Sequence, residues 1–527
     1  MAINTWWATR PKRDIRGVVP ILSVVVTHAE GRKWAHPDKR TELSIERALE
    51  DAGLKTRGTR RDQTGGGART YRAWLKSLGL IFMDGEDRLW PTLAGEAILD
   101  GAAPLPILSK LVLSTQFPSA FTRTPQSAVD PRFQVRPFIF LLQLLTDPRI
   151  GGYLDEREDI AKVVICYAES NSQRCVDDVV ERISALRSNG DSSLPDDYVS
   201  RFKSSRMKST SFDTLISNLR DIANTFANQI SFTQLVTVSA GRWEIAPGAS
   251  EAAAAAIAEY RDVPLISHAD DEERFQRRFG LPPGKSKDLR ALGSEARSIS
   301  GAAIVAREIT TAFLSLASTR IITSITPDVV DEVASITGAT SAEVERVLAK
   351  KFPAGGLDTF MTEYAALAFG SRERASAFEQ ATAAIFSSVF GFNTKHVGQQ
   401  GIRPDVVISS PTDDFAAIID AKAYGDRYSA THDHRNRMVA YIKNYEKYAI
   451  DDKPLAFFSY AVSDFKSTIS NQLAGIEAEA GIPGSAITAR DLIRMVERNK
   501  RKPYTHSELR RIFSSGRGLS SADLSLT

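Results

Sequence analysis

Three charged residues, Asp405, Asp420 and Lys422, have the types and spacing of a metal-assisted hydrolytic site. Asp405 begins one apolar run, and Asp420 and Lys422 end another. Residues i and i+2 of a strand face the same side, so Asp420 and Lys422 are predicted to share one space, into which a hairpin could also bring Asp405. Burying these charges is costly unless they pair or bind an ion.

The ion that suits these side chains is Mg²⁺, which takes hard oxygen ligands, typically one or two carboxylates completed by water and phosphate oxygens. Asp405 and Asp420 are predicted to hold Mg²⁺, with the backbone carbonyl of Ala421 as an additional ligand and Mn²⁺ as a substitute metal. Lys422 is predicted to orient the attacking water or help to deprotonate it. The alternative is a surface hairpin with an ion pair at the end of a strand.

The segments around these residues predict the elements that position them. A helix is expected over residues 374–390, with Phe378, Ile385, Phe386 and Val389 buried on one face and Glu379 beside it. Gly391 should end that helix. A polar loop (393–401), a strand (405–408), a turn (409–414), a second strand (415–422) and a later helix (435–448) are expected to follow.

The N-terminal part of the chain is basic. Residues 1–80 contain 16 Lys and Arg against 8 Asp and Glu, a net charge of +8, which leaves −5 for the remaining 447 residues. Such an excess suits contact with phosphates, although a solvated charged surface is the alternative. The candidate DNA contacts are Arg57, Arg60, Arg61, Arg69, Arg72 and Lys76.

Two segments have the order of elements of a winged helix, which places one helix in the major groove beside a supporting hairpin. The first has a helix over residues 68–78, a hairpin over 80–90 and a helix over 92–99. The second has a helix over 211–227, strands over 230–238 and 243–245, and a helix over 250–260. Helices over 159–169 and 174–187 would precede it. Structural or protein-binding modules of this kind are the alternative.

The expected fold is multidomain, with a mainly α N-terminal region that contains winged-helix modules, a helical linker and a C-terminal α/β domain. Its predicted divisions are 1–150, 151–263, 264–370 and 371–527, with a linker candidate at 281–287 and a helix break at 352–356. Residues 1–20 have no signal-peptide pattern, and Cys166 and Cys175 are too few for a disulfide framework. Both observations favour the cytoplasm, and no apolar run is long enough to span a membrane.

Asp405, Asp420 and Lys422 fit the PD-(D/E)xK nuclease signature, and residues 374–465 resemble the cleavage domain of FokI, a type IIS enzyme. The resemblance rests on Thr394–Gly398, Arg403–Asp405 and Ile418–Tyr424. In that family the two acids bind the metal and the lysine assists the water, so the resemblance implies these roles here. Glu379 occupies the place of a helix acid that some relatives use.

The remainder of the chain resembles AlwI-type endonucleases and the large subunits of related nicking enzymes, in residues 34–48, 68–99, 113–145 and 159–187. This resemblance implies a bacterial, cytoplasmic, sequence-specific endonuclease that cuts double-stranded DNA at a fixed distance from its site. It also implies a cognate methyltransferase, and either a transient homodimer on DNA or a small nuclease subunit. Nicking relatives can carry glutamate at the position of Lys422, so this site is nearer FokI.

Several alternatives remain open from the sequence. The chain could be a strand-specific nicking subunit, or a DNA-binding regulator with a non-catalytic nuclease-like domain. His432 and His434 are expected to be solvated loop residues rather than ligands. The basic stretch 490–511 suits either a solvated helix or DNA contact, and Trp6 and Trp7 are expected to fill the N-terminal core.

Overall fold

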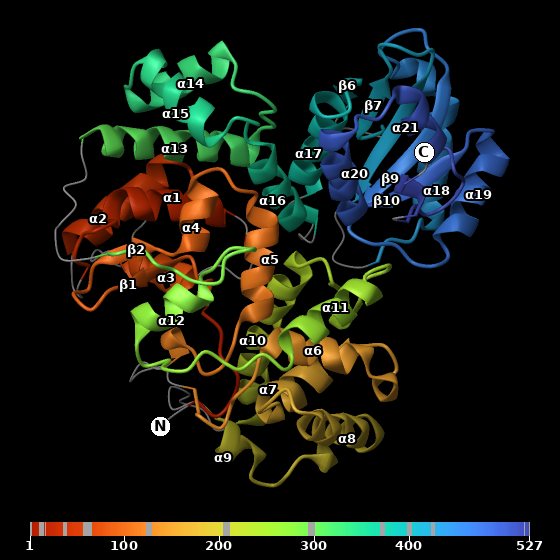
Figure 1. Cartoon of the computed structure of the whole chain (residues 1–527). Coiled ribbons are helices and arrows are strands. Elements are labelled where there is room, and N and C mark those ends of the chain that lie inside the picture. Colours follow the sequence, from red (N-terminus) through yellow and green to blue (C-terminus); the bar gives the residue numbers. More distant parts are fainter. Residues whose placement is uncertain are drawn as a thin grey trace. The chain divides into compact units, whose positions relative to one another are not determined.

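The computed structural model of the 527-residue chain describes residues 3–9, 15, 17–34, 39–55, 66–122, 129–203, 211–292, 301–368, 375–397, 403–422, 427–520 and 522–525. The chain divides into two compact units. Unit 1 comprises residues 1–318 and 324–359, and unit 2 comprises residues 319–323 and 360–527. Unit 1 is mostly helical, and unit 2 is an α/β domain with a mixed sheet (Figure 1).

Unit 1 begins with helices around a short hairpin. Its elements are α1 (Val18–Ala29), α2 (Lys39–Asp51), α3 (Gly66–Ser77), β1 (Ile81–Met83), β2 (Leu89–Pro91) and α4 (Leu93–Leu99). The strands pair antiparallel, and Asp84 accepts hydrogen bonds from the backbone N–H groups of Glu86 and Arg88 in the turn. The expected helix, hairpin and helix are therefore present, and their identification as a winged helix stays a prediction.

The next part of unit 1 packs helices against a three-stranded antiparallel sheet with the order β3-β5-β4. Its helices are α5 (Pro104–Ser114), α6 (Pro137–Thr146), the π-helical η3 (Glu156–Val164), α7 (Ile165–Tyr167), α8 (Gln173–Asn189), α9 (Tyr198–Phe202), α10 (Phe212–Phe232) and α11 (Ser250–Tyr260). Its strands are β3 (Leu154–Asp155), β4 (Val236–Ser239) and β5 (Arg242–Ile245).

The strand expected from residue 230 is wrong at its start. Helix α10 continues to Phe232, and β4 begins only at Val236. Ile230 and Phe232 are buried on this helix, so their apolar character reflects helix packing rather than strand formation. The second winged-helix interpretation, like the first, stays a prediction.

The expectation that the tryptophan pair fills the core holds for Trp6. Its ring is fully buried, and its Nε1 donates to the backbone oxygen of Ala168 at 2.9 Å. The rings of Phe117, Phe140 and Phe226 lie 6.4, 6.3 and 5.5 Å from it, measured between centroids. Trp7 is only half-buried.

The final part of unit 1 contains helices α12 (Glu272–Phe279), α13 (Gly301–Thr319), α14 (Pro327–Thr337) and α15 (Ser341–Lys351), and the helix break expected at 352–356 is present. Helix α16 (Leu357–Ala368) follows it. The linker candidate 281–287 lies within unit 1, with Leu281 and Pro282 buried and the following five residues exposed. The four-part division of the chain stays a prediction.

Unit 2 is built on a five-stranded sheet with the order β10-β9-β8-β7-β6. Strands β8 (Ala416–Lys422), β9 (Leu455–Val462) and β10 (Gly484–Thr488) are parallel, whereas β7 (Val406–Ser409) and β6 (Asn393–His396) run antiparallel to their neighbours. The polar loop expected from residue 393 is therefore wrong over Asn393–His396, which forms an edge strand. Residues 398–402 lie outside the described residues.

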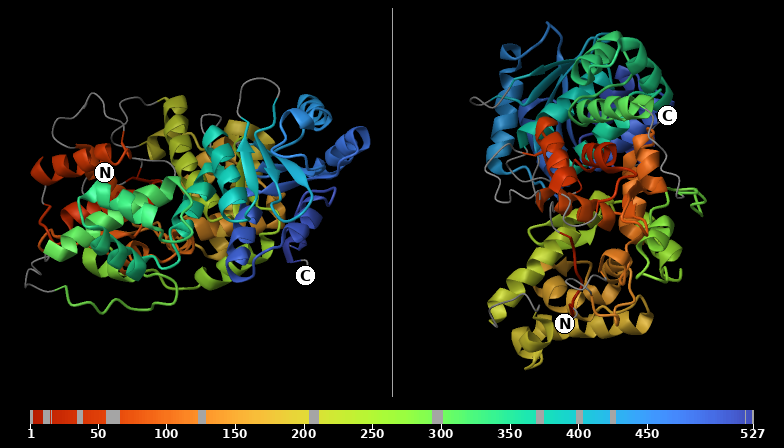
Figure 2. Two further views of the ribbon diagram at one scale, coloured as in Figure 1. Left: turned by 90° about the horizontal axis from the view of Figure 1, so that it is seen from above. Right: turned by 90° about the vertical axis from the view of Figure 1, so that its left-hand side faces the viewer.

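Helices contact this sheet on both sides (Figures 1 and 2). One face carries Ile418, Phe458 and Tyr460 against α18 (His432–Lys443) and α19 (Ile469–Ala480). On the other face Phe457 stacks on Phe513, and the adjoining helices are α17 (Ala375–Ser388), α20 (Ala489–Arg501) and α21 (His506–Phe513). The expected helix 435–448 starts earlier, at His432, and ends at Lys443, where a short 3-10 turn continues the chain.

Candidate active site

Strands β7 and β8 bring Asp405, Asp420 and Lys422 together. Val406 pairs with Ile419, so the next step of this antiparallel register sets Asp405 against Asp420. Lys422 Nζ lies 2.9 Å from Asp420 Oδ2 and 3.3 Å from Asp405 Oδ2. The backbone N–H of Ala421 donates to Asp405 Oδ2 at 2.9 Å. The three side chains therefore form one cluster, as their spacing in the sequence predicts.

The cluster is buried and contains two acids and one base. Asp405 and Asp420 are only 8% and 4% exposed. Burial raises the pKa of Asp405, and the neighbouring Asp420 carboxylate raises it further, against the opposing effect of Lys422. Burial alone would lower the pKa of Lys422, but the two carboxylates outweigh it and raise that pKa. Two acids thus share one cation at the end of an apolar strand.

One oxygen of this cluster has no partner. Asp420 Oδ1 is buried and makes no hydrogen bond within the described part of the chain. A buried carboxylate oxygen without a donor is costly, and a cation placed there would satisfy it. The described residues contain no group of three or more His, Cys, Asp and Glu side chains arranged to hold a metal. Two carboxylates suffice for Mg²⁺, which keeps several water ligands, so the donor set fits this ion.

Helix α17 adds a third acid to the surroundings of the cluster. Glu379 is buried on this helix, and its carboxylate contributes to the raised pKa of Asp405. Its Oε2 lies 3.9 Å from His396 Nε2 on the edge strand β6. Glu379 therefore acts on the cluster electrostatically, whereas its catalytic role stays a prediction.

Sequence reasoning missed the aromatic side chains beside the acids. Tyr460 on β9 pairs in register with Asp420, and Tyr441 on α18 is buried. Burial, followed by the negative charge of Asp420, raises the pKa of Tyr441 to about 12. The signal available in the sequence was weak, because these tyrosines have the spacing of an ordinary core.

The sequence predicted that His432 and His434 are loop residues, but the structure places both on a helix. His432 and His434 lie in the first turn of α18, where Thr431 caps the helix. His434 stacks on Tyr428 with ring centroids 5.6 Å apart. Burial lowers its pKa, and Lys422 lowers it further. The charges of the cluster therefore affect the pKa of His434. His432 is exposed.

The candidate DNA contacts of unit 1 divide into two groups. Arg57, Arg60 and Arg61 lie outside the described residues. Arg69, Arg72 and Lys76 lie on α3, and each has a partner within unit 1. Arg69 pairs with Glu42 at 2.8 Å, Arg72 donates to the backbone oxygen of Trp34 at 2.7 Å, and Lys76 pairs with Glu272 at 2.5 Å. Their role in DNA contact stays a prediction.

The comparisons with known proteins bear chiefly on the C-terminal region. Residues 338–520 match the family model described as FokI, cleavage domain. The type II restriction enzyme StsI of Streptococcus sanguinis is 24% identical over 145 residues, which cover 25% of this chain and 24% of StsI. The chain thus aligns with about a quarter of the length of this curated relative.

Solved structures with detectable similarity include FokI, at 14% identity and a TM-score of 0.28 over 98% of this chain and 99% of that chain. The BpuJ1 endonuclease binding domain, solved with modified DNA, has 15% identity and a TM-score of 0.37 over 53% of this chain and 98% of that chain. No helix in the described part of the chain is long and apolar enough to cross a membrane. Residues 338–520, which include Asp405, Asp420 and Lys422, are therefore similar to the FokI cleavage domain.

Proposed function

We propose that this protein is a type II restriction endonuclease of the IIS kind, which hydrolyses double-stranded DNA at a fixed distance from a recognition site. The observation that carries the proposal is the buried cluster of Asp405, Asp420 and Lys422, with Asp420 Oδ1 left without a donor. The match of residues 338–520 to the FokI cleavage domain supports it, as does the likeness to StsI. The AlwI-type organisation of the N-terminal region belongs to the same proposal.

Asp405 and Asp420 would hold Mg²⁺, with the Ala421 carbonyl as a further ligand. When bound, the ion supplies positive charge that polarises the phosphate and eases deprotonation of the attacking water. Hydrogen bonds from the backbone N–H of Ala421 and from Lys422 Nζ orient the carboxylate of Asp405. Lys422, a basic side chain that contacts both acids, positions the water and stabilises negative charge on the phosphate.

Unit 1 would recognise the DNA through its winged-helix modules, with α3 of the first module at the major groove. One cluster cuts one strand, so a double-strand break requires a second nuclease domain. We propose that another copy of the chain supplies it transiently on DNA, with a small nuclease subunit as the alternative. A methyltransferase with the same site specificity would protect the host DNA.

The decisive experiment incubates supercoiled plasmids of varied sequence with the full chain and Mg²⁺, followed by run-off sequencing of both strands. Cuts at a fixed distance from one sequence on both strands are expected. Products cut on one strand alone would instead favour the nicking subunit. Intact plasmid throughout, or an Asp405→Ala variant that cuts as fast as the wild type, would overturn the nuclease assignment and favour the regulator.

A further inference from the structure

In a segment of unit 1 that no family match assigns to a function, residues 272–290, the most exposed charged residues are all basic. This segment, called the strap below, consists of α12 and the chain that follows it. It contains three acids, Glu272, Glu273 and Asp288, and six basic residues. Arg274, Arg278, Lys285 and Lys287 are exposed and make no ion pair to any residue that the structure describes.

The three acids of the strap are all engaged by cations within unit 1. Glu272 accepts from Lys76 at 2.5 Å and from the backbone N–H of Met83 at 2.7 Å. Glu273 pairs with Arg277 at 3.0 Å. Asp288, whose side chain is almost fully buried, pairs with Arg290 at 2.7 Å. Its pKa would rise on burial, but the hydrogen bond from Arg290 lowers it instead.

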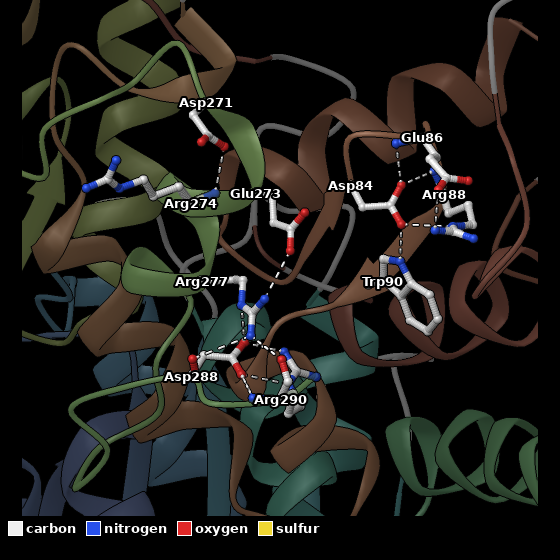
Figure 3. Close-up of polar contacts among 10 residues, drawn as sticks. All are labelled: Asp84, Glu86, Arg88, Trp90, Asp271, Glu273, Arg274, Arg277, Asp288 and Arg290. Carbon is white, nitrogen blue, oxygen red and sulfur yellow. Dashed lines mark hydrogen bonds and ion pairs between the residues drawn. The ribbon is translucent and has the colours of Figure 1, made fainter. Parts of the chain in front are cut away.

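Figure 3 shows this division of the charges. Glu273, Arg277, Asp288 and Arg290 are linked to one another, whereas the side chain of Arg274 extends away from them. Only its backbone N–H is used there, as the donor to the N-cap Asp271. Asp270 and Asp271, which precede the strap, are exposed. Beyond them, every exposed charge from residue 272 to residue 290 is a cation.

The strap is held rigidly enough to present these cations in fixed positions. On α12, Phe275 is fully buried and Gln276 donates to the backbone oxygen of Lys76 at 2.7 Å. A Cβ on Gly280 would lie 2.4 Å from the backbone oxygen of Gly79, so only glycine permits this close approach. Lys110 holds the carbonyl of Leu281 at 2.6 Å.

At its other end, Arg290 reaches Glu96 on α4 at 2.5 Å. Both ends of the exposed loop that carries Lys285 and Lys287 are therefore anchored to the body of unit 1. Anchoring lowers the conformational entropy that these lysines lose on meeting a ligand.

We infer that the strap is a site for the phosphate backbone of duplex DNA, next to the module that contains α3. This inference rests on the proposed function, because it places a second contact for the same DNA. Neutralising phosphates releases condensed counterions, so several exposed cations on one anchored segment favour a polyanion over a small ligand. The contacts of Glu272 with Lys76 and Met83 join the strap directly to α3 and β1. Duplex held at α3 would therefore lie beside these cations.

The test measures binding of the full chain to a fluorescent duplex of about 40 base pairs, in EDTA, over a range of KCl concentrations. Arg274→Gln, Arg278→Gln, Lys285→Gln and Lys287→Gln are combined in one variant. Each lost phosphate contact should reduce the slope of log K against log[KCl] by about 0.9. The combined variant should lower that slope by about 2 or more and weaken binding at least about tenfold in 100 mM KCl.

A matched control carries Arg346→Gln and Lys350→Gln, two exposed residues with the same i,i+4 spacing on α15. This control is compared with a second variant that carries only Arg274→Gln and Arg278→Gln. The control should leave the slope of log K against log[KCl] unchanged. An unaltered slope in the combined variant would overturn the proposed role of the strap in DNA binding. An equal reduction of the slope in the control would overturn it as well. A wild-type protein that binds no duplex would overturn the proposed function as well, which distinguishes the two failures. The tryptophan fluorescence transition of each variant checks that unit 1 remains folded.

Discussion

Buried acids occur in both compact units, but their surroundings differ. In unit 1, Glu42 pairs with Arg69 at 2.8 Å, and Glu46 pairs with Lys55 at 3.0 Å while also accepting from the N–H of Ala68. In unit 2, Asp405 and Asp420 share Lys422. Glu42 and Glu46 have different cations, Arg69 and Lys55, although Lys55 also lies 3.9 Å from Glu50. The two aspartates of unit 2 have a single cation between them.

This difference distinguishes charges that stabilise a fold from charges that serve chemistry. A buried acid with its own cation and donors is compensated, and removing its charge leaves the cation without a partner. Two acids that share one cation repel each other, and this repulsion lowers the free energy of unfolding. Functional sites are where such perturbed groups gather, which agrees with the proposal that a cation binds in unit 2.

Lys422→Gln should cause the largest change, a fall in DNA cleavage of about 10² to 10⁴ fold, typical of the loss of a group that assists proton transfer. Duplex binding in EDTA should stay within about twofold of the wild type, because unit 1 is proposed to carry recognition. The measurement is the single-turnover rate of plasmid cleavage with Mg²⁺, beside a binding titration. Cleavage retained at the wild-type rate would show that Lys422 is not part of the chemistry.

Glu42→Gln in unit 1 should lower the free energy of unfolding by about 1 to 3 kcal/mol, because the charge that holds Arg69 and accepts from Trp34 Nε1 is lost. All six tryptophans lie in unit 1, at positions 6, 7, 34, 74, 90 and 243, so their fluorescence reports the unfolding of that unit. Urea titration followed by this signal provides the measurement. An unchanged midpoint would mean that the buried pair contributes nothing.

Asp405→Asn in unit 2 should raise the free energy of unfolding, the opposite of the effect expected for Glu42→Gln. The raised pKa means that the folded state holds the proton more tightly than the unfolded state does. Asp405 therefore lowers the free energy of unfolding as the pH rises above the ordinary pKa of an aspartate. In EDTA the variant should gain about 1 kcal/mol relative to the wild type at pH 8, and less at pH 5. Circular dichroism follows the unfolding of both units, and the tryptophan transition, which reports unit 1 alone, identifies the remaining change as that of unit 2. A loss of stability at pH 8 would contradict the charge imbalance.

Asp178→Asn on α8 should have the smallest effect, below about 0.5 kcal/mol, because its i,i+4 pair with Arg182 is solvent-exposed. The tryptophan signal measures this change under the same conditions as for Glu42→Gln. A large loss here would mean that burial does not govern the value of ion pairs in unit 1, and the comparison of the two units would lose its basis.

The sequence was sufficient to predict the core of the candidate site. The apolar run before Asp420, the polar turn after residue 409 and the amphipathic helix with Phe378 together predicted β7, β8 and α17 within a few residues. These elements are predictable because their periodicity is local, and the i to i+2 rule then orients Asp420 and Lys422. The nearness of Asp405 was also foreseen, because a hairpin joins the two strands.

Other features depend on contacts that are distant in the sequence. Edge strand β6 is polar, so nothing in Asn393–His396 distinguishes it from a loop until β7 pairs with it. The tyrosine at position 460 approaches Asp420 only because β9 lies parallel to β8. The successive prolines and the single glycine of 281–287 suggested a linker. The preceding Gly280 packs closely against Gly79, and the carbonyl of Leu281 accepts from Lys110 on α5, contacts that no local pattern indicates.

We propose that the acids of unit 2 perform hydrolysis while unit 1 binds the DNA. The most direct test is Asp420→Asn in the full chain, with duplex binding and Mg²⁺-dependent plasmid cleavage measured side by side. This substitution keeps the shape of the side chain and removes the charge beside the unsatisfied Oδ1. The account predicts wild-type binding with cleavage reduced by at least about 10² fold. A variant that still cleaves at the wild-type rate would contradict it.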